Sequence, residues 1–217
     1  MANEKSRLNE SFVFVIIQDY YKQFFWAEQK LLKYMEYLEN TYIPELVKRQ
    51  KQANIKQEKP FDPFYMAEPL VKDTSKYAAA VIVFAAFYLE GRFYRYGAKH
   101  LSASYYEKYL DKLDLKAKYV IIPQLVTGKK MDTSSETFYM LSETVEARNR
   151  LAHPKLIGNK KSKEEDMNKE KGEFNALTKS AHLAYKTLEA ISIEFDKLNN
   201  DGKNQKILQT LFKIPPE

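Results

Sequence analysis

The sequence predicts an all-α protein, and two observations support this fold class. Apolar residues recur every three or four positions along most of the chain, which is the spacing of the buried face of an amphipathic helix. No stretch longer than a few residues alternates apolar and polar side chains as a strand does. We therefore expect a helical bundle, preceded by one extra long helix at the N-terminus.

The first helix is expected over residues 12–38. Its apolar stripe at helical spacing is Phe12, Ile16, Tyr20, Phe24, Ala27, Leu31, Tyr34 and Leu38. Pro44 is expected to open a short basic helix, because proline is tolerated in a first turn. Pro60, Pro63 and Pro69 should prevent a regular helix in the segment that follows. The chain then divides into an N-terminal helical extension (1–58), a Pro-containing linker (59–73), a helical bundle (74–202) and a C-terminal tail (203–217).

The second long helix is expected to begin near Ser75 as its N-cap and to run toward Gly97. It is apolar nearly all round, as a central helix should be. Its most apolar part, Ala78–Leu89, is shorter than the roughly 20 residues that a membrane span needs. We therefore expect this helix at the centre of the bundle and no membrane partner.

Capping boxes mark the next two helices. Ser104 and Glu107 should open a third helical stretch, which Pro123 should kink or end. Thr133 and Glu136 have the same spacing and should open a fourth helix. Its predicted core-facing stripe is Phe138, Leu141, Val145, Arg148 and Ala152.

A charged segment, NKKSKEEDMNKEKGE (159–173), is expected to be a mobile, solvated loop before the last helix. That helix should end at the Asn-Asn-Asp-Gly turn of residues 199–202. Its stripe is the most regular in the chain: Phe174, Leu177, Ala181, Ala184, Leu188, Ile191, Phe195 and Leu198.

Composition excludes several classes of chemistry. The formal net charge of +6 permits a polyanionic partner, and the absence of cysteine excludes disulfides, thiolate nucleophiles and sulfur-bound zinc. Phosphate loops, nucleophile elbows and metal-ligand spacings are also missing from the sequence, so we expect no metal and no cofactor. No signal peptide is recognisable, and a cytoplasmic location is expected. Two of the three histidines, His100 and His182, are expected to be solvated or structurally satisfied.

The stretch EARNRLAHPK near residue 150 departs from this ordinary pattern. At 100° per residue, Glu146, Asn149 and His153 share one polar stripe, while Arg148 falls inside the apolar arc and Arg150 points the opposite way. A buried guanidinium needs a counter-charge, because arginine does not lose its proton.

Arg148 must therefore pair with an acid, for which Glu90 is our candidate, or face a second molecule. One alternative is purely structural. In it Arg148 holds an ion pair, and His153 ends the helix where the dipole favours a cation, before Pro154 stops it. Spacing alone leaves both alternatives open.

The run Arg148-Asn149-x-x-x-His153 resembles the signature of the HEPN superfamily, whose fold is a small up-and-down bundle with a four-helix core. Residues 79–93 and 113–128 look like the first two core helices of that family, and they lead into the helix that carries the motif. The resemblance covers residues 74–200 and leaves the N-terminal helix outside.

The resemblance implies metal-independent RNA cleavage, with Arg148, Asn149 and His153 as catalytic residues and Glu146 and Glu90 as supporting residues. The chemistry is reasonable, because RNA supplies its own 2′-OH nucleophile. A histidine can carry a proton near neutral pH, and an arginine can hold phosphate oxygens. In-line displacement needs proton transfer on two sides of phosphorus. We therefore expect a homodimer in which two copies of the motif form one site.

Four basic residues near the motif are candidate contacts to the RNA backbone: Arg150, Lys155, Lys160 and Lys161. They are equally well explained as solvated surface charge. If the site is active, we expect a toxin or anti-phage defence protein, with an antitoxin or another regulatory protein as a further partner. The alternative is a catalytically inactive HEPN-like module that dimerises, binds a nucleotide or binds a protein.

Overall fold

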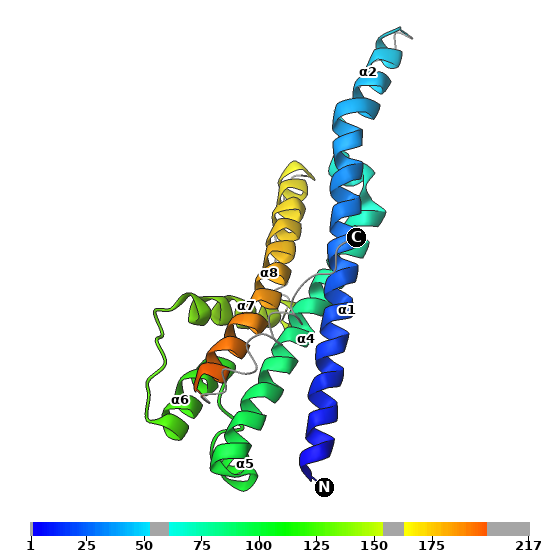
Figure 1. Ribbon diagram of the computed structural model, residues 1–217. Helices are drawn as coiled ribbons and strands as arrows, with labels where there is room; N and C mark the ends of the chain where they lie inside the picture. Colours follow the sequence, from blue (N-terminus) through cyan, green and yellow to red (C-terminus); the bar gives the residue numbers. More distant parts are fainter. Residues whose placement is uncertain (1, 53–60, 154–162, 199–217) are drawn as a thin grey trace.

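The computed structural model describes residues 2–52, 61–153 and 163–198 (Figure 1). These ranges contain helices and connecting turns and no strand, so the predicted all-α fold class is confirmed. The helices are α1 (Ala2–Tyr37), the π-helical turn η1 (Leu38–Tyr42), α2 (Ile43–Gln52), α3 (Pro63–Met66), α4 (Glu68–Leu101), α5 (Ala103–Tyr109), α6 (Leu115–Thr127), α7 (Glu136–Ala152) and α8 (Lys163–Leu198).

Three long helices, α1, α4 and α8, form the frame of the molecule (Figure 1). α1 runs antiparallel to α4, because Phe14 contacts Tyr88 and Tyr20 stacks on Phe84, with ring centroids 5.5 and 5.2 Å apart. α4 lies between α1 and α8 and also contacts α5, α6 and α7. The predicted extra N-terminal helix is thus a structural part of the bundle, packed along its central helix.

α4 holds this central position because it carries apolar residues nearly all round and small residues at its closest contacts. Ala78, Ala85 and Ala86 are almost fully buried. Gly97 lies inside the helix, where an added Cβ would stand 2.5 Å from the Tyr106 ring. By length and composition α4 would also be able to cross a membrane, a test that the core helix of a soluble protein passes as well.

The start of α4 differs from the sequence prediction. α4 begins at Glu68 rather than near Ser75, with Pro69 in its first turn, where a missing N–H costs no helical hydrogen bond. Asp62 caps the short helix α3 by accepting from the Phe64 N–H at 3.0 Å. The expectation that the prolines exclude helix from this segment is therefore wrong, because two of them stand at helix starts.

The third predicted helical stretch is two helices. Ser102, not Ser104, caps α5, and Asp114 caps α6 by accepting from the Ala117 N–H at 2.7 Å. Pro123 lies inside α6 without ending it, and the helix stops at Gly128, whose φ of 72° suits a left-handed cap. Local capping chemistry thus decides the boundaries more than the proline does.

α8 begins at Lys163, so the predicted loop of residues 159–173 is helical from that residue onward. Lysine and glutamate are good helix formers, and Lys169 and Glu173 form an i,i+4 ion pair at 3.5 Å. The part of the predicted loop before Lys163 lies outside the described residues. The predicted stripe of α8 is confirmed at its centre, where Ala181, Leu188 and Ile191 are fully buried.

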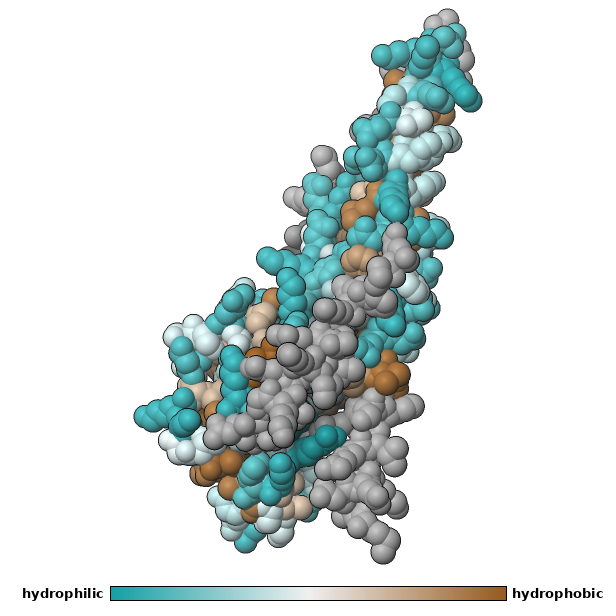
Figure 2. Space-filling model, viewed as in Figure 1, coloured by the Kyte–Doolittle hydropathy of each residue, from teal (hydrophilic) through white to brown (hydrophobic). Residues whose placement is uncertain are grey.

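The end of α1 continues through η1 into α2 as a narrow projection beyond the bundle (Figure 1). Its surface is mostly hydrophilic, with isolated hydrophobic residues (Figure 2). At its base a small second core contains Leu31, Leu38 and Ala67, against which Phe174 packs. The molecule therefore has a main core along α4 and a smaller one where α1, α3, α4 and α8 meet.

Candidate functional site

The residues singled out by the sequence lie at the C-terminal end of α7. Ser135, rather than the predicted Thr133, caps the start of this helix by accepting from the Phe138 N–H at 3.2 Å. Thr144 fixes its middle to α8 through a buried hydroxyl contact of 3.0 Å with Thr187. The helix ends at Ala152, and His153 is its C-cap, with an N–H that donates to the Asn149 carbonyl at 2.9 Å.

Most residues of the motif are buried or exposed as their positions on the helix predict. Arg148 is partly buried, whereas Asn149, Arg150 and His153 are exposed. Glu146 is exposed as well. Ala152, predicted on the buried stripe, is also exposed, because the helix ends there and has no neighbour left to cover it. The end of α7 therefore presents a half-buried guanidinium beside exposed amide and imidazole groups.

Arg148 has no counter-charge among the described residues. Its Nε is buried without a hydrogen-bond partner, and no ion pair of this guanidinium occurs in the described part of the chain. The predicted partner, Glu90, instead holds the Lys118 Nζ at 2.6 Å, and the Lys118 side chain is only 3% exposed. The expected Arg148–Glu90 pair is thus wrong. A buried ammonium group needs a carboxylate more than a half-buried guanidinium does.

His153 is equally free of partners within the described residues. No hydrogen bond joins the side chains of Arg148, Asn149 and His153 across the described ranges, and Glu146 contacts none of them through an ion pair. The three groups are placed together by one helix end and not by bonds to one another. Lys155, Lys160 and Lys161 lie outside the described residues.

The electrostatics of this helix end have two opposing parts. The C-terminus of a helix carries partial negative charge, which weakens binding of an anion by about 0.3 to 1 kcal/mol at an exposed site. Arg148 and Arg150 supply two positive charges near the end of the helix, and the exposed Glu146 supplies a negative one. Full charges outweigh the dipole, so an anion is favoured here only through the two arginines.

His182 is structurally satisfied, one of the two outcomes expected from the sequence, although its partners could not be predicted from spacing. The Tyr21 hydroxyl lies 2.9 Å from His182 Nδ1, and His182 Nε2 lies 2.8 Å from Glu28 Oε2. Because a carboxylate only accepts, Nε2–H donates to Glu28 and leaves Nδ1 to accept from Tyr21 in the neutral ring. Burial raises the pKa of Tyr21 to about 12, with Tyr185 and Glu28 adding to the shift.

Charged and phenolic groups also meet where α4, α6 and α8 pack together. Arg92 pairs with Asp196 at 3.0 Å, and the Tyr119 hydroxyl donates to Glu194. Burial, and then the bond to Glu194, raise the pKa of Tyr119. Nothing in the spacing of these residues could have revealed the pairs, because each joins two helices far apart in the chain.

Two cavities of about 390 and 240 Å³ lie at the small second core, and both have Phe64 and Phe174 in their walls. Neither is lined by Arg148, Asn149 or His153. Within the described ranges no cluster of His, Asp and Glu is arranged to hold a metal ion.

Comparison with protein-family models, with curated proteins and with solved structures finds no match to the chain.

Proposed function

We propose that this protein is a metal-independent endoribonuclease of the HEPN type, with Arg148 and His153 of two copies forming one site. The observation that carries the proposal is the buried Nε of Arg148, which has no hydrogen-bond partner among the described residues and lies five residues before an exposed histidine at the end of the same helix.

Arg148 is best satisfied by an anion from outside the described chain. A guanidinium keeps its charge, and leaving a buried donor without a partner costs about 1 to 3 kcal/mol, more when the group is charged. Two phosphate oxygens match the planar fork of arginine and can take two N–H groups at once. The phosphodiester of RNA supplies such oxygens, and charge builds up on them during cleavage.

His153 can supply the proton transfer. Its exposed ring has neither nitrogen engaged by a described residue, so one nitrogen can accept the 2′-OH proton or donate to the 5′-oxygen. The exposed amide of Asn149 lies one turn earlier and can orient the phosphate or the ring. The products would be a 2′,3′-cyclic phosphate and a 5′-hydroxyl end.

One chain offers only one such histidine, so the proposed site needs two. In-line displacement places the attacking and leaving oxygens on opposite sides of phosphorus, and one imidazole does not reach both. A two-fold dimer that brings the two α7 ends together supplies a base and an acid with identical surroundings.

A second candidate function, a non-catalytic interaction module, is favoured by the exposed face of α1. Val15, Trp26 and Tyr37 are 60%, 49% and 49% exposed. Their spacing of eleven residues turns the helix by only about 20° beyond whole turns, so they share one face. Large exposed apolar side chains on one helix face are typical of protein contact sites.

The deciding experiment is RNA cleavage with excess EDTA, comparing wild type with Arg148→Ala and His153→Ala. Arg49→Ala, on the exposed end of α2, and His100→Ala, at the exposed end of α4, are matched controls. The proposal expects chelator-resistant cleavage by wild type and both controls and none by the two site variants. Cleavage by all five proteins indicates a contaminant, and inertness of all five over varied RNAs favours the interaction module.

A further inference from the structure

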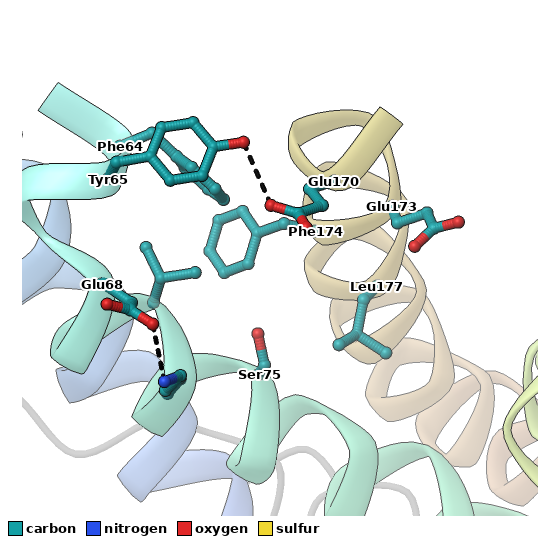
Figure 3. Close-up of a pocket in the computed structure, with 10 residues that line it drawn as sticks. Phe64, Tyr65, Glu68, Ser75, Glu170, Glu173, Phe174 and Leu177 are labelled. Carbon is teal, nitrogen blue, oxygen red and sulfur yellow. Dashed lines mark hydrogen bonds and ion pairs between the residues drawn. The ribbon is translucent and has the colours of Figure 1, made fainter. Parts of the chain in front are cut away.

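The larger cavity lies between the N-terminal halves of α4 and α8, beside α3 (Figure 3). Its volume of about 390 Å³ is within the range of small-molecule sites, roughly 300 to 1,000 Å³. Apolar walls come from three helices: Phe64 from α3, Val71 from α4, and Phe174 and Leu177 from α8.

Aromatic rings meet edge to face in the wall of this cavity. The Phe64 ring stands nearly perpendicular to the Tyr65 ring, at 84° with centroids 5.3 Å apart, and at 68° to the Phe174 ring. Such rings present negative faces, which attract cations. Lys171 already lies near this cluster, with its Nζ 5.9 Å from the Phe64 centroid.

The charges that line the cavity are mainly negative. They are three glutamates, Glu68, Glu170 and Glu173, against one lysine, Lys72. Glu68 pairs with Lys72 at 2.6 Å and Glu173 contacts Lys169 at 3.5 Å, so Glu170 is the lining carboxylate that has no ion pair with a described residue. The lining of the cavity is therefore more negative than the chain as a whole, whose net charge is +6. Its carboxylates would repel the phosphates of RNA.

Glu170 and Glu173 both keep room for a ligand. The Glu170 carboxylate accepts one hydrogen bond, from the Tyr65 hydroxyl at 3.0 Å, and a carboxylate has about four acceptor positions. Glu173 has only a 3.5 Å contact with Lys169, with side chains 67% and 38% exposed, and such surface pairs are weak. The two carboxylates lie on one face of α8, at i and i+3.

We infer that this cavity binds a small organic cation, an amine attached to an apolar or aromatic group. The apolar part would lie against Phe64, Phe174 and Leu177, and the ammonium group would donate to Glu170. Tyr65 holds the Glu170 carboxylate in place through its hydroxyl. This site is separate from the end of α7 and does not depend on RNA cleavage.

The test is binding of three probes that share a phenylethyl group to the whole protein by titration calorimetry: phenethylamine, phenethyl alcohol and hydrocinnamate. We expect saturable binding of the amine and at least tenfold weaker binding of the alcohol and the carboxylate. Glu170→Gln should weaken amine binding by about two- to fivefold, because this carboxylate is exposed and exposed ion pairs are weak. Glu45→Gln, a comparably exposed glutamate on α2, should leave it unchanged.

A second variant locates the apolar half of the site. Phe174→Leu keeps an apolar side chain and should weaken amine binding, with a melting curve that verifies folding. The inference is overturned if the amine fails to bind, if amine and alcohol bind equally well, or if Glu170→Gln binds the amine as tightly as wild type does.

Discussion

Two partly buried arginines of the bundle differ in what surrounds them. Arg92, on α4, pairs with Asp196 of α8 at 3.0 Å, with side chains 19% and 10% exposed. Arg148, on α7, has a buried Nε and no partner in the described part of the chain. An arginine that serves only the fold carries its counter-charge with it. The one that lacks a counter-charge is the better candidate for a ligand contact.

The histidines show the same contrast. His182 is bonded on both ring nitrogens, to Tyr21 and Glu28, and joins α1 to α8. His153 is exposed at a helix end, with no side-chain bond to any described residue. Both nitrogens of His182 are engaged by protein groups, whereas those of His153 are open to a substrate as far as the described residues are concerned. Arg92 and His182 are thus structural residues, bonded to other helices of the bundle. Arg148 and His153 are available for a ligand.

The largest expected effect concerns Arg148 and His153. Arg148→Ala and His153→Ala should each lower RNA cleavage by about 10²- to 10⁴-fold, the range for loss of an acid-base group or a charge-stabilising donor. Neither change should lower the free energy of unfolding, measured in urea, by more than about 1 kcal/mol, because no ion pair among the described residues is lost and Arg148→Ala also removes an unpaired buried donor. If Arg148→Ala loses about 3 kcal/mol or more, Arg148 is a structural residue and the contrast fails.

The next effect concerns the ion pair between Arg92 and Asp196. Asp196→Ala should lower the free energy of unfolding by about 3 to 5 kcal/mol, because it leaves Arg92 charged and partly buried without a partner. Urea unfolding measures this, with the exposed Asp111→Ala as the matched control. A loss under about 1 kcal/mol would mean that the arginine pairing is not what distinguishes these two regions.

A smaller, pH-dependent effect belongs to the His182 site. The pKa of Tyr21 rises from 10.0 unfolded to about 12 folded, because burial disfavours the phenolate. The contribution of Tyr21 to the free energy of unfolding is complete below pH 10 and falls as the pH rises toward 12. The total loss is about 2 to 3 kcal/mol, at about 1.4 kcal/mol per pH unit. Tyr21→Phe should therefore show a flatter loss of stability between pH 10 and 12. Equal slopes in the two proteins would contradict this.

The smallest effect tests the helix that carries the motif. Ser135→Ala should cost about 1 kcal/mol, as for loss of an N-cap, while Thr133→Ala should be nearly neutral. Thermal or urea unfolding compares the two variants. The reverse order would show that the capping box of the sequence, and not the observed cap, begins α7. Cleavage per folded molecule should be unchanged in both.

Much of the fold could be predicted from the sequence because it depends on local periodicity. The helices around the stripes of α1, α7 and α8 were expected in the right places, as was the apolar centre of α4. Helix ends were predicted less well: Pro69 begins a helix, Pro123 does not end one, and Ser102 and Ser135 replace the expected caps. The choice between neighbouring caps depends on how each helix is packed.

The sequence alone determined the helical character, the central position of α4 and the sorting of Arg148 inward and His153 outward, because each depends on spacing along one helix. Only the tertiary structure decided which charges meet. Glu90 pairs with Lys118, His182 is bonded to Tyr21 and Glu28, and Arg148 has no partner among the residues that the structure describes. The tertiary structure also placed Glu170 beside an aromatic cavity. Such contacts join helices that are distant in the chain, and no spacing along one helix encodes them.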